Sequence, residues 1–231
     1  MLQIDAVDAS YGKVQILHDL SLIALPGQVT CLMGRNGAGK TTTLRAIMGQ
    51  VQKTNGSIRL NGEDISKVSA HDIPKKGIGY VPQGRRLFGE MTVAENLEIG
   101  LMTLGHGSAT RDRVLEMFPR LRERMAQQSR TLSGGEQQML AIARTLCIEP
   151  RVLLLDEPTE GLQPSMITMI KDTILALKSM GVAIILVEQR VDAVLTLADQ
   201  IAFMVGGRVM ESVPAIRLTK DAAQFRKYIG I

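Results

Sequence analysis

The 231-residue chain has no tryptophan, and aromatic residues make up only 3% of it. Its net charge is +4, but the basic residues are dispersed along the chain. Proteins that bind nucleic acid usually gather basic residues into a patch and often add aromatic side chains on which bases stack. We therefore expect no nucleic acid among the partners of this protein.

Cysteine and histidine are also scarce. Cys31 and Cys147 are the only cysteines, each lies among apolar residues, and neither belongs to a CxxC or Cys/His spacing that could hold a metal. The histidines His18, His71 and His106 are scattered, without a second ligand nearby. We expect the cysteines to pack as small buried apolar residues.

Long apolar runs are missing as well. Residues 152–155 and 182–187 are far shorter than the roughly 20 residues that a membrane-spanning helix needs. Residues 1–5 show neither the basic leader nor the apolar core of a signal peptide. We therefore expect a cytoplasmic protein that folds as one compact unit with a minor lobe.

The first part of the chain carries the signals of an antiparallel sheet. Residues 2–7 and 16–23 alternate apolar with polar side chains, as half-buried strands do. Asn61-Gly62 separates residues 57–60 from residues 63–65, and this dipeptide favours the tight turn of a hairpin. An antiparallel β subdomain near the N-terminus follows from these signals.

Continuous apolar runs predict a second sheet with buried parallel strands. Each of these runs has a helical pattern before or after it, and they cover residues 29–33, 152–155 and 182–187. Near the end of the chain, Gly206-Gly207 joins residues 201–205 to residues 208–211 and predicts another hairpin. The core is therefore expected to be an α/β sheet.

Strand signals vanish between Gln83 and Leu132. Residues 93–101 and 111–125 have helical patterns, and the glycine-rich residues 105–108 predict a loop between them. We expect a single domain over 1–231. It consists of a core with the β subdomain, residues 1–83 and 132–231, and an inserted α-helical subdomain, residues 84–131.

A glycine-rich segment follows the apolar strand 29–33 and precedes a predicted helix over 41–48. Backbone N–H groups of such a loop, together with the helix N-terminus, bind phosphate oxygens. Lys40 is expected to reach the β- and γ-phosphates of a nucleotide, and the hydroxyl of Thr41 to ligate Mg²⁺. The segment matches the pattern GxxxxGK[ST] in full, with Gly34, Arg35, Asn36, Gly37, Ala38, Gly39, Lys40 and Thr41.

Two acidic residues follow the apolar strand 152–155. The carboxyl ends of strands are where open α/β sheets bind their ligands. Asp156 suits direct or indirect coordination of Mg²⁺, because a hard cation prefers oxygen ligands. Glu157 faces another direction and can act as a general base for an attacking water.

A second candidate anion site lies at residues 132–138. Ser133 can cap a helix predicted over 136–147, and Gly134-Gly135 leaves its first N–H groups uncovered. One chain thus carries two candidate phosphate sites.

With these three motifs in this order, residues 1–212 resemble the ATP-binding-cassette (ABC) family. The resemblance implies a P-loop NTPase fold with a mixed central sheet, and an ATPase that uses ATP and Mg²⁺. It implies a head-to-tail dimer in which one subunit's signature segment completes the ATP site of the other. That segment is Ser133, Gly134, Gly135 and Glu136.

The same resemblance assigns three further residues to the ATP site. Gln83 matches the glutamine that contacts Mg²⁺ or water and joins the helical lobe to the core. Tyr11 matches the aromatic residue that stacks on adenine, and Thr42 extends the phosphate loop.

Two positions depart from the family pattern. Gln189 occupies the place of the usual switch histidine, and as a neutral amide it can donate a hydrogen bond to a γ-phosphate but cannot become cationic. Gln163 replaces an aspartate that the family has after Asp156-Glu157. We therefore expect Glu157 and Gln189 to be the catalytic residues, with a glutamine in place of the usual histidine at the switch position.

The Gln189 variant, residues 84–88 and residues 132–144 are similar to ATPase subunits of branched-chain amino acid importers. Residues 159–164 are more similar to relatives that import urea or short amides. The resemblance implies a second ATPase subunit, identical or homologous, separate membrane permeases and an external solute-binding protein as partners. It also implies a position on the inner face of the cell membrane.

Three other classes of ATP-binding protein fit the sequence less well. Cassettes of DNA repair or chromosome maintenance carry long coiled-coil insertions, and no sustained heptad run occurs between Lys40 and Ser133. Ribosome-acting cassettes usually carry two cassettes in one chain. A small-molecule kinase with a phosphate loop would not need the signature segment at 132–136.

Overall fold

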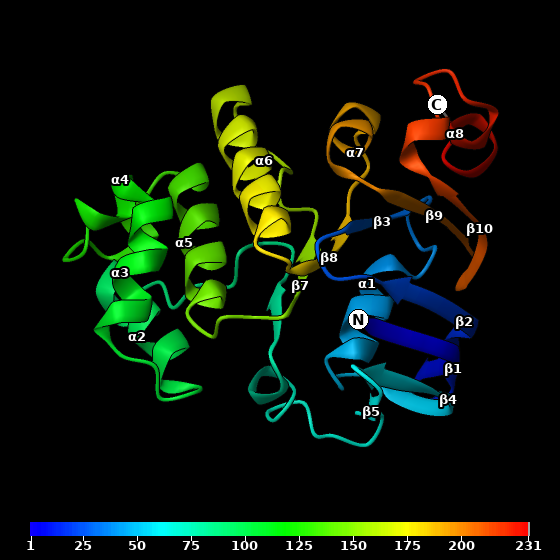
Figure 1. Ribbon diagram of the computed structural model, residues 1–231, viewed down its shortest axis with the longest axis horizontal. Coiled ribbons are helices and arrows are strands. Elements are labelled where there is room, and N and C mark those ends of the chain that lie inside the picture. The colour runs from blue at the N-terminus through cyan, green and yellow to red at the C-terminus, as the bar shows by residue number, and fades with distance from the viewer. Residues whose placement is uncertain (231) are drawn as a thin grey trace.

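Two sheets, drawn as arrows in Figure 1, make up the β structure of the computed structural model, which describes residues 1–230. The antiparallel sheet has the order β2-β1-β4-β5 and the other sheet the order β10-β9-β3-β8-β7-β6. The first contains β1 (Leu2–Tyr11), β2 (Val14–Ala24), β4 (Gln52–Leu60) and β5 (Glu63–Asp64). The second contains β3 (Val29–Met33), β6 (Ile78–Val81), β7 (Val152–Asp156), β8 (Ala183–Val187), β9 (Gln200–Val205) and β10 (Arg208–Pro214).

The larger sheet is parallel from β6 to β9, and only β10 runs antiparallel to its neighbour. Every residue of β3, β7 and β8 is buried. Leu153 and Leu155 pack in one hydrophobic core and Leu154 in the other, because successive side chains of a strand point to opposite faces. The continuous apolar runs are thus explained by helices on both faces, and the predicted α/β core is confirmed.

Helices cover both faces of the larger sheet (Figure 1). Helix α1 (Lys40–Ile47) packs between the two sheets and contacts β2, β4 and β7. The opposite face carries α6 (Pro164–Ser179) and α7 (Val191–Leu197), and α8 (Ala223–Tyr228) packs on β9. In α8, the Phe225 and Tyr228 rings lie 5.7 and 5.0 Å from the Phe203 ring, between centroids.

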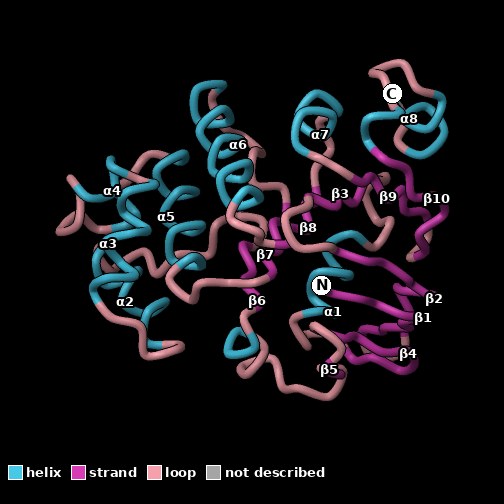
Figure 2. Tube along the Cα trace, viewed as in Figure 1, coloured by secondary structure: helices cyan, strands magenta, loops and turns pink. Residues whose placement is uncertain are grey.

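A group of helices without strands lies to one side of the sheets, as Figure 2 shows. It consists of α2 (Val93–Met102), α3 (Ser108–Met117), α4 (Pro119–Arg122) and α5 (Gly134–Leu146). Because α5 packs against α2, α3 and α4, the helical group extends beyond residue 131. The division into subdomains at residues 84 and 131 stays a prediction.

The prediction of a single helix over residues 111–125 is wrong. Helix α3 ends at Met117, Phe118 has φ −131° and ψ 68°, and Pro119 begins the short helix α4. Proline cannot donate a backbone hydrogen bond, and it pushes the preceding residue out of the helical region. The apolar pattern continues across the break because both helices bury residues in the same core, such as Leu115 and Leu121.

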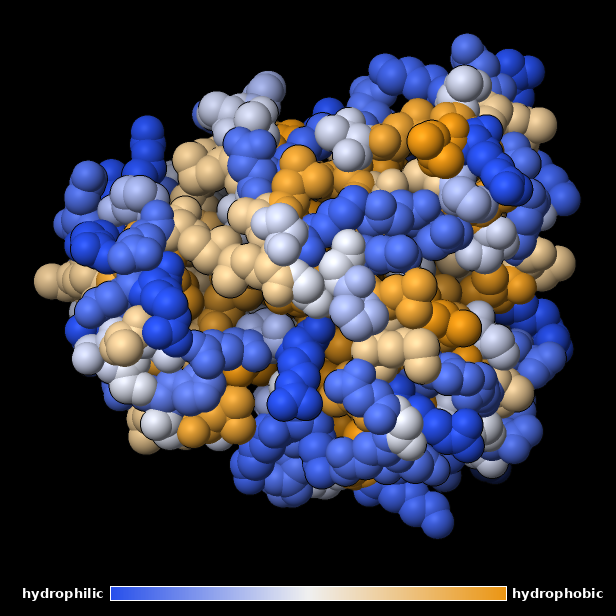
Figure 3. Space-filling view, viewed as in Figure 1, coloured by the Kyte–Doolittle hydropathy of each residue, from blue (hydrophilic) through white to orange (hydrophobic). Residues whose placement is uncertain are grey.

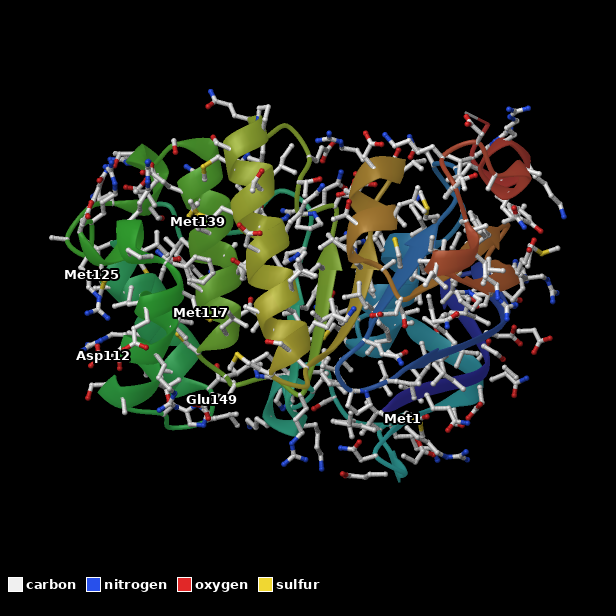
Figure 4. All side chains as sticks on the ribbon, turned by 45° about the horizontal axis from the view of Figure 1, so that its top comes forward. Met1, Asp112, Met117, Met125, Met139 and Glu149 are labelled. Carbon is white, nitrogen blue, oxygen red and sulfur yellow. The ribbon has the colours of Figure 1, made fainter. Side chains whose placement is uncertain are left out.

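Methionines fill part of the helical group. Met139 is buried in α5, and Met117 and Met125 pack against the same core. Figure 4 shows these three side chains among the helices, far from Met1, which precedes the first strand of the antiparallel sheet.

Hydrophilic side chains dominate the rim of the face drawn in Figure 3, while apolar ones reach the surface in its middle.

The described residues include no helix that is both long and apolar enough to cross a bilayer.

Both predicted hairpin turns are present. Asn61 and Gly62 have φ angles of 50° and 88°, and Gly206 and Gly207 have φ angles of 52° and 76°. Two consecutive positive φ angles are typical of the tight turn whose twist matches that of the strands it joins.

The second turn also supports the phosphate-loop segment. The backbone N–H of Gly207 donates to the carbonyl of Ala38 at 2.9 Å, and its carbonyl accepts from the N–H of His18 at 3.1 Å. A Cβ at Gly207 would lie 1.8 Å from the carbonyl oxygen of Ile16, whereas a Cβ at Gly206 would meet nothing within 4 Å. The fold therefore requires glycine at 207 for close packing, and at 206 only for its backbone angle.

We expect Gly206→Ala to lower the free energy of unfolding by about 1–2 kcal/mol, the cost of a left-handed backbone for alanine. Gly207→Ala adds a backbone clash, so its loss should be larger by about 1–3 kcal/mol. Urea denaturation of the two variants measures the difference. Equal losses for the two variants would contradict this account of the turn.

Candidate functional site

The phosphate loop predicted from the sequence lies between the end of β3 and the start of α1. Gly37 and Gly39 have φ angles of 81° and 103°, which turn the chain tightly at the helix start. Gly39 is the N-cap of α1 and supplies no side chain to the helix, so the first N–H groups of α1 have no side-chain cap. This end of α1 is therefore suited to an anion.

Lys40 lies folded into the loop. Its Nζ donates to the carbonyl oxygens of Gly34 at 2.8 Å and Arg35 at 3.1 Å. Burial lowers the pKa of Lys40, and the nearby carboxylates of Glu157 and Asp156 oppose that shift. A buried ammonium group with only carbonyl partners is suited to the negative charge of a phosphate.

Asp156 lies at the end of β7 and is 1% exposed. Its carboxylate accepts hydrogen bonds from the hydroxyls of Thr41, at 3.1 Å, and Tyr80, at 3.3 Å. Burial raises the pKa of Asp156, whereas these hydrogen bonds and the charges of Arg45 and Lys40 oppose that shift. Burial, followed by the charge of Asp156, raises the pKa of Tyr80 to about 12.

The pair of Thr41 and Asp156 fits Mg²⁺. No group of three or more His, Cys, Asp or Glu residues that could enclose a metal occurs among residues 1–230. Mg²⁺ is usually bound by one or two protein oxygens together with phosphate oxygens and water, so it needs no such group. A buried carboxylate beside a hydroxyl at the phosphate loop supplies the protein share of that set.

Glu157 follows Asp156 and has a left-handed backbone, with φ 49°. Its N–H donates to the carbonyl of Val187 on the neighbouring strand β8 at 2.9 Å. The Glu157 side chain lies between two glutamine amides: Gln189 donates to Oε1 at 2.5 Å and Gln83 to Oε2 at 3.3 Å. A non-glycine residue in this conformation is a feature often found at functional sites.

Gln189 follows β8 and reaches two elements of the site. Besides Glu157, its amide nitrogen donates to Asn36 Oδ1 in the phosphate loop at 3.3 Å. The switch position thus contacts both the predicted base and the loop.

A cavity of about 480 Å³ brings most of the predicted site residues together. Gly34, Arg35 and Asp156 adjoin it: Gly34 and Arg35 through Lys40, Asp156 through Thr41. Its lining includes Tyr11, Asn36, Gly37, Ala38, Gly39, Lys40, Thr41, Thr42, Gln83, Glu157 and Gln189.

Tyr11 lies at the edge of the cavity with 42% of its surface exposed. Its hydroxyl accepts a hydrogen bond from Arg45 at 3.4 Å. An exposed ring at the mouth of the cavity is available for stacking, and contact with adenine stays a prediction.

The signature segment does not line this cavity. Ser133 caps α5: its Oγ accepts from the N–H of Glu136, and the Glu136 carboxylate accepts from the N–H of Ser133 at 2.9 Å. Arg124 also pairs with Glu136, at 3.0 Å. Within one subunit, Glu136 therefore stabilises the start of the helix, and contact of this segment with a partner's ATP stays a prediction.

Two acidic residues near the site were missed by the sequence analysis. Glu160 lines the cavity and accepts from the Gln83 amide at 2.8 Å. Glu188 is 4% exposed and accepts from the Thr159 hydroxyl and from the N–H of Gln189. A signal existed for Glu188, because it follows an apolar strand as Asp156 does, whereas the position of Glu160 depends on a turn.

Comparisons with known proteins agree with this geometry. The sequence model of the ABC transporter family matches residues 17–160. The chain is 45% identical, over all of both chains, to the high-affinity branched-chain amino acid transport ATP-binding protein BraG of Pseudomonas aeruginosa. It is 39% identical, over 90% of each chain, to the probable branched-chain amino acid transport ATP-binding protein LivF of Archaeoglobus fulgidus.

Among solved structures, MJ1267, an ATP-binding cassette of an ABC transporter, superposes with a TM-score of 0.88 at 25% identity, over 99% of this chain and 97% of that one. The family match and the full-length similarity lead to the same assignment. The chain belongs to the ABC transporter family and is an ATP-binding subunit that hydrolyses ATP to drive transport.

Proposed function

We propose that this chain powers the import of branched-chain amino acids. The observation that carries the proposal is the 45% identity to BraG over the whole of both chains. Urea and short amides remain the second candidate cargo, because residues 159–164 are similar to the corresponding segment of amide importers. ABC cassettes dimerise and work with transmembrane permease subunits, so the cargo would not contact this chain.

In the proposed ATP complex, the phosphates lie in the loop of residues 34–41. The N–H groups at the start of α1 and the ammonium group of Lys40 bind the β- and γ-phosphates. Thr41 and Asp156 would hold Mg²⁺, and Gln83 would contribute an oxygen to it or to a water. When bound, Mg²⁺ neutralises charge on the phosphate oxygens. The exposed ring of Tyr11 stacks on adenine.

Hydrolysis follows from the position of Glu157. A water attacks the γ-phosphorus, the bond to the bridging oxygen breaks, and ADP is the leaving group. Glu157 accepts the proton of the water as general base. Gln189, hydrogen-bonded to Glu157 and Asn36, orients the water or the γ-phosphate through its amide.

The site of one subunit is completed by its partner. Ser133, Gly134 and Gly135 stand at the N-terminus of α5, where the capping box covers the N–H groups of Ser133 and Glu136 and leaves those of Gly134 and Gly135 for an anion. We infer that this segment, with Glu136 fixing its cap, binds the γ-phosphate held by Lys40 of a second subunit. The assembly includes membrane permeases and an external solute-binding protein, with this chain on the inner face of the membrane.

We expect Glu157→Gln to lower the turnover of ATP by about 100-fold, because the base is lost. The contacts to ATP remain, so an ATP-bound dimer should accumulate. Phosphate release and gel filtration with Mg-ATP measure the two effects, with Glu123→Gln, an exposed carboxylate in the helical group, as control. Normal turnover in the Glu157 variant would assign the base to another residue.

A mixture of two inactive variants tests the composite site. Ser133→Arg blocks the signature segment, and Lys40→Ala removes the phosphate contact. A mixed dimer has one intact site, formed by Lys40 of the first variant and Ser133 of the second. We expect partial recovery of both ATPase activity and ATP-dependent dimerisation, and recovery of neither would contradict the arrangement.

Uptake by a reconstituted transporter tests the cargo. The chain, co-purified with its permeases and placed in proteoliposomes with the solute-binding protein, should accumulate labelled leucine, isoleucine and valine when ATP is supplied. Glu157→Gln should abolish this accumulation. Uptake of urea in place of these amino acids would favour the second candidate, and ATP-driven uptake of neither would refute both.

A further inference from the structure

Gln83 has both of its amide hydrogens directed at carboxylates. Its Nε2 lies 2.8 Å from Glu160 Oε2 and 3.3 Å from Glu157 Oε2. Ionised carboxylates only accept hydrogen bonds, so the NH₂ group must face them and the carbonyl oxygen must face elsewhere. Two acceptors on one side thus fix the orientation of this amide.

Glu160 and Glu157 share the two hydrogens of the Gln83 amide. The bond to Glu160 is the shorter, 2.8 Å against 3.3 Å for the bond to Glu157. The other oxygen of Glu157 already accepts from Gln189 at 2.5 Å. Both oxygens of Glu157 thus accept from amides, but the bond from Gln83 is long. Without Glu160, the Gln83 amide would be free to move closer to Glu157 and to shorten that bond.

Glu160 is attached to a well-supported turn. Its backbone N–H donates to the carbonyl of Glu157 at 3.2 Å. The preceding residue, Thr159, is 2% exposed, and its hydroxyl donates to the buried carboxylate of Glu188 at 2.5 Å. Glu160 is therefore an exposed acceptor on a turn that is anchored by buried Thr159, whereas Gln83 begins the segment that leads from β6 to the helical group.

We propose that Glu160 is a positioning residue for ATP hydrolysis, which holds the NH₂ group of Gln83 and thereby keeps the hydrogen bond from Gln83 to Oε2 of Glu157 long, so that Oε2 can accept the proton of the attacking water. This inference rests on the proposed roles of Glu157 and Gln83. Glu160 itself contacts neither the water nor the phosphates; it acts through Gln83.

Glu160→Ala and Glu160→Gln separate the hydrogen bond from the charge. Alanine removes the acceptor, and we expect kcat to fall by about tenfold, the effect of losing one hydrogen bond to a charged group. Glutamine keeps an acceptor oxygen, so kcat should recover to within about threefold of the unchanged protein. Equal losses of kcat in the two variants would overturn the proposal.

The negative charge of Glu160 has a separate effect on the affinity for ATP. Both variants remove a negative charge from the cavity that holds Lys40 and Thr41, so ATP should bind about two- to threefold more tightly to each. Titration of a fluorescent ATP analogue in EDTA measures this without hydrolysis. Glu123→Gln, outside the cavity, should change neither kcat nor affinity.

A double-mutant cycle decides whether Glu160 acts through Gln83. Gln83→Ala should lower kcat, and Glu160→Ala should have no further effect on kcat in that background. If the losses of kcat in the two single variants multiply in the double variant, the proposal is overturned. If Gln83→Ala lowers kcat and Glu160→Ala does not, this inference fails and the proposed site stands; if Gln83→Ala leaves kcat unchanged, the role of Gln83 fails, and the inference with it.

Discussion

The parallel pairing of β3, β7 and β8 is the constraint on which the site depends. Because the three strands run in one direction, their carboxyl ends lie at the same edge of the sheet, where Leu32 pairs with Val187 and Val187 pairs with Asp156. Three segments distant in sequence are thereby brought together: the phosphate loop after β3, Asp156-Glu157 after β7, and Gln189 after β8. The position of the site is therefore a property of the sheet, and the loops determine its chemistry.

The same burial that makes these strands rigid puts charged groups in an unfavourable environment. Burial lowers the pKa of Lys40 and raises that of Asp156, so it favours the neutral form of each. The two charges oppose these shifts for one another, and Thr41 and Tyr80 add hydrogen bonds to Asp156. In the proposed complex, a nucleotide with its magnesium ion carries both signs of charge, so a single ligand would compensate both groups. Under that proposal, an aspartate and a lysine at one edge of a core built mainly of aliphatic side chains serve the ligand.

Local signals were enough to predict much of this structure from the sequence. The buried strands and both glycine turns are set by residues next to one another, and the structure confirms them. It also has the expected loop between a strand and a helix at residues 34–41, where phosphate binding stays a prediction. The helix expected over 111–125 was wrong although Pro119 was a visible signal, because the apolar pattern continues through the break. Glu160 could not be found in this way, because its contact with Gln83 joins residues 77 positions apart through a turn and a loop. The role of the signature segment, residues 133–136, stays a prediction for another reason: its proposed ligand is bound by another subunit.

Gln189 stands where the family resemblance predicts a histidine, and the two side chains differ in whether their hydrogen-bond donors change with pH. A histidine changes its donors when it titrates near neutral pH, whereas an amide keeps the same two donors and one acceptor throughout. In this chain, amides from two different elements, Gln189 after β8 and Gln83 after β6, meet on the two oxygens of one carboxylate. Under the proposed roles, any displacement of the helical group moves the segment that begins at Gln83, and with it one of the two donors on Glu157. Glu157 is then coupled to the helical group by hydrogen-bond geometry and not by a titrating group. In our proposal, Glu160 sets the strength of that coupling, because it accepts the shorter of the two hydrogen bonds from Gln83.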